Sequence, residues 1–398
     1  MIIQHYSKWF RFSILALYND FTPANGGIIM SNECIRTGII GGSLNHQWAS
    51  RTHIPALSSS PLHQITAIAT SKMESALQSA AALDVPLAFA GHQELSQSAE
   101  VELVVVSIRV PFHYEAVKTA ILAGKHVYCE WPLAVTASQA EELAELADQA
   151  GIHHAIGLQA RLDNAVLEAK RRIESGEIGR ILSCTMQVST QGKGGVTDRK
   201  GAYLLMEENG ATLLTINGGH SLDVLCYLLG DFKELSAAMN SNYSQAVFAD
   251  TGEPAAKNTA DQIMIHGTLS SAASVSVHIQ GGVYPGFTMD IQGEKGIIRL
   301  SQRHSLGHVQ FGGLQLRQAV YEPDSSAASS MDDFKTVLPE KEETRSPVQN
   351  ILKAHTVLAR DILDHTFHSA NFHDALRLHR LLDTIRQAAS TGQRQQLI

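Results

Sequence analysis

Short apolar runs alternate with helix-like segments over the first third of the chain. Four runs rich in β-branched residues are typical of buried strands: CIRTGIIGG (34–42), QITAIAT (64–70), VELVVVSI (101–108) and KHVYCE (125–130). Three segments have helical periodicity: 71–84, 113–125 and 136–151, the last ending at Gly151. Strands that alternate with helices of this length favour right-handed βαβ units. The sequence therefore predicts a doubly wound α/β domain with a parallel sheet.

The pattern changes after residue 159. A helix is predicted at 162–179, and four segments with alternating polar and apolar positions follow: 180–190, 261–269, 273–282 and 287–301. Strands of this kind, separated by glycine turns, favour an open and mostly antiparallel sheet. Residues 316–347, rich in Ser, Asp, Glu and Pro, are predicted to form a long exposed loop. Helices are predicted at 348–366 and 374–389.

These patterns predict three parts of the chain. Residues 1–33 are expected to be a disordered extension, and residues 34–157 a dinucleotide-binding Rossmann domain. Residues 158–398 are expected to form an α+β domain for substrate binding and oligomerisation, with its last helices packed back on the first domain. With 398 residues, 44% of them hydrophobic, the chain is long enough for two domains that each bury a core.

Charge and cysteine content exclude several classes of protein. The net charge is −8, and no basic block is long enough to follow a phosphate backbone, so direct nucleic-acid binding is not expected. The four cysteines show no C-x-x-C spacing, which disfavours disulfides or a zinc site and indicates a reducing compartment. No apolar run reaches the ~18 residues that span a membrane. We expect a cytoplasmic protein without a metal.

The segment KWFRFSILALYND (8–20) weakly resembles a secretory signal, because Lys8 and Arg11 stand beside the apolar run 12–18. That run is at the lower limit of length, and no small-residue cleavage site follows it. We interpret residues 1–29 as a poorly ordered extension, or as the result of an upstream start with Met30 as the functional first residue.

A glycine pair follows the first predicted strand, where a dinucleotide-binding loop would lie. Gly41 and Gly42 let the backbone turn sharply towards a pyrophosphate, and Ser43, Asn45 and nearby backbone N–H groups are candidate phosphate ligands. The usual G-x-G-x-x-G is absent, however, and a glycine pair is as often a plain tight turn. The loop alone leaves cofactor binding open.

The end of the second predicted strand bears on the choice of cofactor. An acidic residue there would accept hydrogen bonds from the adenosine ribose, but the chain has Thr70, Ser71 and Lys72. A 2′-phosphate can sit against Ser71 and Lys72, so the sequence favours NADP over NAD. The alternative is a helix cap at Ser71 with a solvated lysine.

Six segments together resemble one family of oxidoreductases. They occur in the family order over residues 34–390 and read THIPAL, VVSIRVPFHYEAV, AGKHVYCEWPLA, GLQARLDNAVLEAKRRIESGEIGRI, GGHSLDVLCYLLGD and IQGEKGIIRLS. As a set they resemble the glucose–fructose oxidoreductase, inositol dehydrogenase and MocA family (Gfo/Idh/MocA). The resemblance implies a Rossmann domain and a C-terminal domain whose open sheet commonly forms an oligomer interface, here of a homodimer. It also implies a sugar or polyol bound between the domains.

Further details resemble one branch of this family. The segments WASRTH, SIRVPFHY, CEW and NGATLLTINGGHSLDVL resemble the branch of the galactose-regulating repressors of yeast, which bind a nicotinamide dinucleotide. The resemblance implies two alternative functions. One is an NAD(P)-dependent oxidoreductase acting on the CH–OH groups of a sugar or polyol. The other is a catalytically inactive dinucleotide sensor with a protein partner, located in the nucleus as well as the cytoplasm.

The resemblance also implies a candidate catalytic site. Catalytic family members use the lysine of an E-K-P motif and an Asp and a His four residues apart, and these positions are Trp131, Ile216 and His220 here. His220 is the candidate proton acceptor, since an imidazole titrates near pH ~6.5, although a histidine beside glycines at a helix start can be structural. Asp223, one turn further on, is a candidate for binding His220 or the substrate, or for facing solvent or capping the helix.

Three more assignments concern the substrate. The indole of Trp131 offers a flat apolar platform for the C–H face of a pyranose, or it fills the volume of the missing lysine. Gln159 and Arg161 lie at the end of and just after the segment HHAIGLQ (153–159), which is expected to be a further strand, and they are candidate ligands of sugar hydroxyls. A surface salt bridge is the alternative for Arg161.

Four residues are expected beside the nicotinamide half of the cofactor. Arg109 and Pro111 end the third strand near the expected ribose, where they shape the backbone, and His113 starts the next helix. Glu130 ends a strand at the edge where sites of parallel sheets open. Its carboxylate is expected to face a ligand or to make a structural hydrogen bond on the nicotinamide side.

Three of these residues bear on the choice between the two functions. The retained His220 favours the oxidoreductase, whereas Trp131 and Ile216 favour the sensor, since each acid–base group contributes on the order of 10²–10⁴-fold to a rate. Because family members vary their catalytic polar groups, the oxidoreductase is the preferred interpretation.

Overall fold

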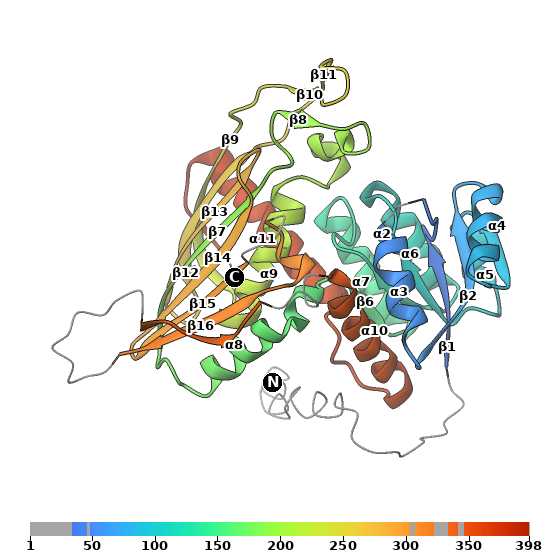
Figure 1. Cartoon of the computed structure of the whole chain (residues 1–398), viewed down its shortest axis with the longest axis horizontal. Helices are drawn as coiled ribbons and strands as arrows, with labels where there is room; N and C mark the ends of the chain where they lie inside the picture. Colours follow the sequence, from blue (N-terminus) through green and yellow to red (C-terminus); the bar gives the residue numbers. More distant parts are fainter. Residues whose placement is uncertain (1–33, 46–47, 303–306, 322–332, 341–345, 398) are drawn as a thin grey trace. The chain divides into compact units, whose positions relative to one another are not determined.

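The computed structural model describes residues 34–45, 48–302, 307–321, 333–340 and 346–397 (Figure 1). The expected extension at 1–33, with its signal-like run and Met30, lies outside these residues. One parallel sheet and one mostly antiparallel sheet organise the described part of the chain. The predicted fold class is therefore confirmed.

The parallel sheet has six strands in the order β3-β2-β1-β4-β5-β6. The strands are β1 (Ile35–Ile40), β2 (His63–Thr70), β3 (Leu87–Ala90), β4 (Leu103–Val106), β5 (His126–Cys129) and β6 (His154–Ile156). The helices of this half are α2 (Trp48–Arg51), α3 (His53–Ser58), α4 (Met73–Ala82), α5 (His92–Gln97), α6 (His113–Leu122) and α7 (Ala137–Ala150). This strand order is that of dinucleotide-binding domains, whose sites open at the carboxyl ends of the strands.

Continuous apolar strands form here because the sheet is covered on both faces. All four residues of β4 are fully buried. Val105 packs in one cluster with Leu57 of α3, whereas Val104 packs in another cluster with residues of α6 and α7. The pattern misses β3 and α5, because β3 is a short edge strand with partly exposed residues.

The second large sheet has nine strands in the order β17-β16-β15-β14-β7-β13-β12-β9-β18. They are β7 (Ile181–Thr190), β9 (Phe232–Asn240), β12 (Gln262–Leu269), β13 (Ser274–Gly281), β14 (Gly286–Gly293), β15 (Gly296–Gln302), β16 (Gln315–Val320), β17 (Lys335–Leu338) and β18 (Gln395–Gln396). Its strand pairs are antiparallel except β13 with β7. A separate small sheet contains β8 (Val196–Thr197), β10 (Ala246–Phe248) and β11 (Pro254–Ala255).

Two expectations for this half are wrong. The segment 287–301 is not one strand, because it folds back at Gly293–Gly296 into the antiparallel pair β14 and β15. The expected long loop at 316–347 contains most of β16 and all of β17, which pair with each other. Both are polar strands near the edge of the sheet, where few apolar positions mark a strand.

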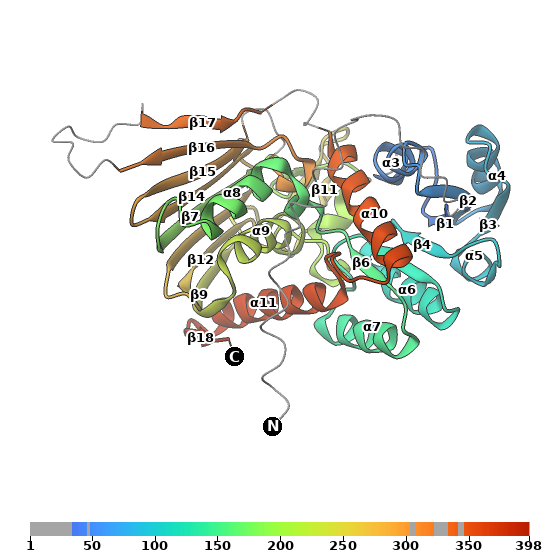
Figure 2. The ribbon, with the colours of Figure 1, turned by 90° about the horizontal axis from the view of Figure 1, so that it is seen from below.

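Helices lie on one face of the nine-stranded sheet, and in the part of the chain described the opposite face has none (Figure 2). They are α8 (Asn164–Glu174), α9 (Gly219–Leu229) and α11 (Phe372–Thr391). The helix α10 (Pro347–Asp364) instead packs on α3. The segment between α10 and α11 also contacts the parallel sheet, because the backbone N–H of Ile156 in β6 donates to the Ala370 carbonyl at 2.8 Å. Within the described ranges, no helix has both the length and the apolar character needed to cross a bilayer.

Candidate functional site

The glycine pair lies at the carboxyl end of β1, between β2 and β4. Gly41 has a φ of 93°, and both glycine N–H groups donate to the Ala69 carbonyl, at 2.9 and 3.3 Å. A Cβ at Gly41 would collide with the Ser107 carbonyl oxygen, and one at Gly42 would lie 2.9 Å from Ile68 Cγ2. The turn therefore requires glycines, because a left-handed backbone and close packing exclude a side chain. This turn and the strand order fit a dinucleotide.

The other predicted phosphate ligands lie just after β1 and at the end of β2. The side chain of Asn45 is exposed, and its backbone N–H donates to Ser43 Oγ at 3.4 Å. At the end of β2, Thr70 Oγ1 donates to the Lys72 carbonyl at 2.8 Å and so closes a turn, whereas Ser71 and Lys72 are exposed. Their cofactor role stays a prediction.

The residues after β4 differ in their exposure, and their cofactor role stays a prediction. Arg109 and Pro111 are exposed, and the Arg109 guanidinium lies 4.6 Å from the centre of the Tyr203 ring. His113 is buried, with Nδ1 2.7 Å from the Pro132 carbonyl oxygen and Nε2 3.0 Å from that of Ile108. Its ring thus connects the segments after β4 and β5. Burial lowers the pKa of His113, and a neutral imidazole donates only one of these two bonds.

Glu130, directly after β5, is buried and already has partners. Its Oε1 lies 2.8 Å from His53 Nε2, and its Oε2 accepts from Gln310 Nε2 at 3.4 Å. The other ring nitrogen of His53 lies 2.9 Å from His355 Nε2 of α10. Of the two alternatives for Glu130, the observed contacts are the structural hydrogen bonds. They connect β5 to α3, α10 and the segment before β16.

Trp131 is packed between the two halves of the described chain. It is 3% exposed, its Nε1 donates to the Thr215 carbonyl at 2.8 Å, and its ring centre lies 4.7 Å from that of His379. A Cβ at Gly219 would lie 2.5 Å from Trp131 Nε1, so the indole requires glycine at the start of α9. These contacts agree with the volume-filling alternative. The substrate-binding role of Trp131 stays a prediction.

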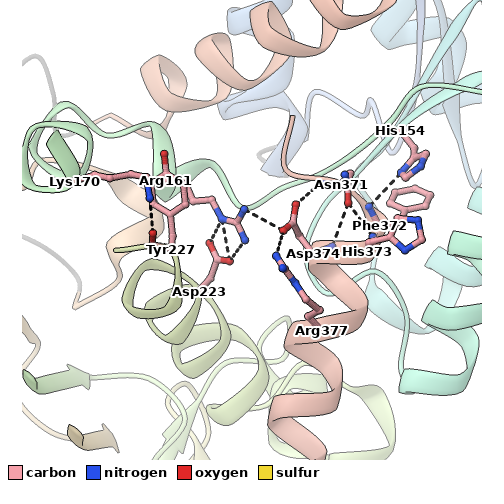
Figure 3. Close-up of polar contacts among 10 residues, drawn as sticks. All are labelled: His154, Arg161, Lys170, Asp223, Tyr227, Asn371, Phe372, His373, Asp374 and Arg377. Carbon is pink, nitrogen blue, oxygen red and sulfur yellow. Dashed lines mark hydrogen bonds and ion pairs between the residues drawn. The ribbon is translucent and has the colours of Figure 1, made fainter. Parts of the chain in front are cut away.

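Arg161 and Asp223 bind each other in what we call the guanidinium cluster, shown in Figure 3 and made of Arg161, Asp223, Asp374 and Arg377. Arg161 Nε donates to both Asp223 carboxylate oxygens at 3.1 and 2.9 Å, and Arg161 Nη1 lies 3.3 Å from Asp374. Arg377 also pairs with Asp374. The cluster joins η3 (Gln159–Leu162) to α9 and α11. Arg161 does form a salt bridge, as its alternative stated, but the pair is largely buried and not on the surface. Asp223 makes no hydrogen bond to either ring nitrogen of His220.

Three buried polar side chains nearby lack such partners, and we call them the imidazole cluster: Gln159, His220 and His308. Within the described residues, no hydrogen bond is made by either amide atom of Gln159, either ring nitrogen of His220, or Nε2 of His308. The rings of His220 and His308 have centres 5.2 Å apart. Gln159 begins η3, His220 is in α9 and His308 precedes η7 (Val309–Phe311), and these three elements contact one another.

Both histidines of the imidazole cluster are neutral at pH 7. Burial, and to a smaller extent the charge of Lys193, lower the pKa of His220 to about 3. Burial, and then His220 and Lys193, hold the pKa of His308 well below its ordinary value. His308 Nδ1 accepts the backbone N–H of Gln310 at 3.4 Å, so its proton is on Nε2. Neutral imidazoles suit hydrogen bonds to hydroxyl groups, and the catalytic role of His220 stays a prediction.

The sequence pattern misses two residues here, His308 and Lys193. Lys193 lies between β7 and β8, and its Nζ donates to the carbonyls of Ala211 at 3.0 Å and Thr212 at 2.8 Å. The glycines around it, in QGKGG, are a signal that could have identified it. His308 is one of 19 histidines, and nothing in its sequence context distinguishes it.

Comparisons with known proteins agree with this architecture. Residues 35–157 match the family described as "Oxidoreductase family, NAD-binding Rossmann fold", and residues 164–302 match "Gal80p, C-terminal domain". The dehydrogenase aclE of Aspergillus oryzae is 33% identical over 281 residues, which span 67% of this chain and 76% of that protein.

The chain is also similar to a regulatory protein, at nearly the same sequence identity. The galactose/lactose metabolism regulatory protein GAL80 of Kluyveromyces lactis is 30% identical over 315 residues, 72% of this chain and 68% of that protein. The crystal structure of the transcriptional regulator Gal80p from the same yeast has a TM-score of 0.82 and 26% identity, and the match covers 96% of this chain and 98% of that one. Dehydrogenases and regulators are thus both among its relatives.

Proposed function

The chain belongs to the Gfo/Idh/MocA oxidoreductase family, with its NAD-binding Rossmann fold, and we propose that it is an NAD(P)-dependent oxidoreductase acting on a CH–OH group of a sugar or polyol. The observation that carries this proposal is the imidazole cluster. Five of its buried polar atoms, the two amide atoms of Gln159, both ring nitrogens of His220 and Nε2 of His308, have no partners among the described residues. Gln159 begins η3, which follows β6, and ligands of such sheets bind beyond the carboxyl ends of the strands.

Unpartnered buried polar atoms are costly, which is the physical reason to assign them a ligand. Each costs roughly 1–3 kcal/mol when its hydrogen bond is lost. A polyol offers hydroxyl groups that donate and accept, as do the amide of Gln159 and neutral imidazoles. Gln159, His220 and His308 would therefore hold and orient the hydroxyl groups of the substrate.

The cofactor would lie along the carboxyl edge of the parallel sheet. Gly41 and Gly42 allow the pyrophosphate to approach the backbone, and Ser71 with Lys72 would contact a 2′-phosphate, which favours NADP. When bound, the nicotinamide supplies the hydride acceptor for the oxidation of the alcohol. The residues of the chain would position the alcohol and take up its proton.

The proposal is tested by ligand titration followed by a substrate panel. The protein is titrated with NADPH and NADH by fluorescence, and sugars and polyols are then screened at the absorbance band of the reduced nicotinamide. We expect dinucleotide binding and a substrate-dependent change in this band. Dinucleotide binding without turnover of any compound in the panel would contradict the proposal that the protein is an enzyme.

A His220→Leu variant sharpens this test. It removes a candidate ligand of the substrate and leaves the glycine turn intact, so turnover should fall at least ~100-fold while dinucleotide affinity is kept. His266→Leu is the matched control, because that histidine is exposed on the nine-stranded sheet. Equal turnover in both variants would count against a substrate at the imidazole cluster.

A second candidate function is that of a dinucleotide-dependent regulator with a protein partner. The similarity of residues 164–302 to the C-terminal domain of Gal80p favours it, as do Trp131 and Ile216 at positions where catalytic members have polar groups. This function predicts tight dinucleotide binding, no turnover, and no effect of His220→Leu on partner binding.

A further inference from the structure

Lys193 is held inward by an unusual backbone. It has a φ of 63°, a left-handed conformation that costs a non-glycine residue about 1–2 kcal/mol. The loop lies directly against the end of β13, where the Gly282 N–H donates to the Gly192 carbonyl at 3.0 Å. A Cβ at Gly281 would lie 2.8 Å from the Lys193 carbonyl oxygen. Glycines therefore allow the close approach, while the lysine occupies the strained position, as residues at functional sites often do.

The amino group of Lys193 has carbonyl partners and, among the described residues, no carboxylate. Nζ donates to the carbonyls of Ala211 and Thr212. These two bonds use two of its tetrahedral positions. The third is an N–H in the ammonium form and a lone pair in the neutral amine, so this group can exchange one proton without losing its two bonds.

The same contacts place Lys193 beside the candidate site. The Thr212 carbonyl that receives its amino group also accepts the Ile216 N–H at 3.0 Å, and Ile216 stands where catalytic family members have the aspartate. Its charge acts on the rings of His220 and His308, lowering the pKa of each. Lysine, rings and the Ile216 turn thus belong to one region.

We propose that Lys193 is the proton-accepting catalytic residue of this site and replaces the lysine that is absent at position 131, an inference that rests on the proposed oxidoreductase function. In the oxidative direction, the substrate O–H bond breaks and its proton moves to the Lys193 Nζ lone pair. The C–H bond breaks with its electron pair passing to the oxidised nicotinamide dinucleotide, and the C=O bond forms. One alcohol and one oxidised dinucleotide give one carbonyl compound, one reduced dinucleotide and one proton on Lys193.

The acid–base properties of the neighbouring groups support this assignment. Burial lowers the pKa of Lys193 to about 7, so that the neutral amine is well populated near neutral pH. The pKa of His220 is lowered to about 3, and a base so weak holds a proton poorly at pH 7. A catalytic base works best when its pKa lies near the operating pH. Lys193 takes the proton in this account, and His220 and His308 hold the hydroxyl group.

The first test measures the lysine itself, without turnover. Protein labelled with ¹³C and ¹⁵N in its lysines is titrated by NMR from pH 5.5 to 10.5, and the Lys193 side-chain signal is assigned by its loss in Lys193→Met. We expect a titration near pH 7, set by burial, because the rings of His220 and His308, which its charge affects, are neutral in this pH range. A signal that stays in the ammonium form up to pH 10 would overturn the inference.

The second test separates a base from a structural cation. Lys193→Arg keeps a positive charge and N–H donors for Ala211 and Thr212, but it cannot take up a proton at these pH values. It should fold and bind NADPH like the wild type, and lose at least ~100-fold in turnover together with the rise of the rate around pH 7. Lys170→Met, which removes an amino group bound to the Tyr227 carbonyl, is the control and should keep the profile.

The outcomes distinguish the two proposals. If the wild type turns over a polyol and Lys193→Arg retains its rate within about threefold and its pH profile, the oxidoreductase stands and the role of Lys193 is overturned. If the wild type shows no turnover with any compound of the panel, the proposed function fails, and the catalytic step of Lys193 fails with it.

Discussion

Two polar clusters share η3 and α9, and they differ in how fully their groups are satisfied. In the guanidinium cluster, Arg161 binds Asp223 and Asp374. In the imidazole cluster, Gln159 and His220 make no side-chain hydrogen bonds within the described residues. Arg161 is two residues from Gln159, and Asp223 is three residues from His220.

The difference indicates two kinds of buried polar group. A fully paired group ties elements together, and removing one partner is costly because it leaves a buried charge. An unpaired group already carries its desolvation cost, so replacing it by an apolar side chain of similar shape can be neutral or stabilising. The imidazole cluster therefore costs the free protein stability, which a ligand would restore.

The largest effect on stability is expected in the guanidinium cluster. Arg161→Met leaves Asp223 and Asp374 without their shared partner, and we expect the free energy of unfolding to fall by about 3–5 kcal/mol. Urea unfolding measures the loss. Arg380→Met is the control, since Arg380 and its partner Glu141 are exposed, and it should cost at most ~1 kcal/mol. Equal losses of unfolding free energy in the two variants would show that the guanidinium cluster contributes no more than an exposed ion pair.

The imidazole cluster should reveal itself through acid sensitivity. The pKa of His220 is lowered from 6.5 to about 3 by burial, so between these values the unfolded chain binds a proton that the folded chain does not. Stability from this residue is therefore highest above pH ~6.5 and falls with decreasing pH by up to about 1.4 kcal/mol per unit.

In His220→Leu the unfolding free energy should therefore fall less steeply from pH 6.5 to 4.5, because the unfolded chain of this variant takes up about one proton fewer than that of the wild type. Urea unfolding at several pH values gives both slopes. Parallel slopes for the variant and the wild type would show that His220 does not titrate with a lowered pKa.

A smaller effect is expected at Trp131. Trp131→Phe removes the N–H that donates to the Thr215 carbonyl and should cost about 1–3 kcal/mol of unfolding free energy. Trp48→Phe is a matched control, because Trp48 Nε1 is also buried but has no partner among the described residues. Its cost should be distinctly lower. If both substitutions cost the same, the bond to Thr215 does not anchor Trp131.

The same contrast explains how far the sequence could predict the molecule. Strands buried on both faces, such as β4, leave continuous apolar runs, so the Rossmann half and the resemblance to its family are confirmed. The polar strands β16 and β17 lack such a pattern and look like a loop.

In the site, sequence order conceals the pairing. Arg161 and Asp223 lie 62 residues apart and were both assigned to a substrate, yet they bind each other. His308 lies beside His220, and the charge of Lys193 acts on His220, only through tertiary structure, because these two residues come from loops before β16 and after β7. Motif reasoning finds positions that a family shares, but it cannot find a group supplied from another segment.

The central claim is that the imidazole cluster is kept unpaired for a ligand, and His220→Leu tests it most directly, because neither ring nitrogen of His220 has a partner among the described residues. The unfolding free energy of this variant and of the wild type is measured without ligand, and again with NADPH and the polyol or sugar that turns over best. We predict equal or greater stability of the variant without ligand, within about 1 kcal/mol, and loss of the stabilisation that the substrate gives the wild type. A loss above ~2 kcal/mol without ligand, with the substrate effect intact, would show that His220 is a structural residue and would contradict this claim.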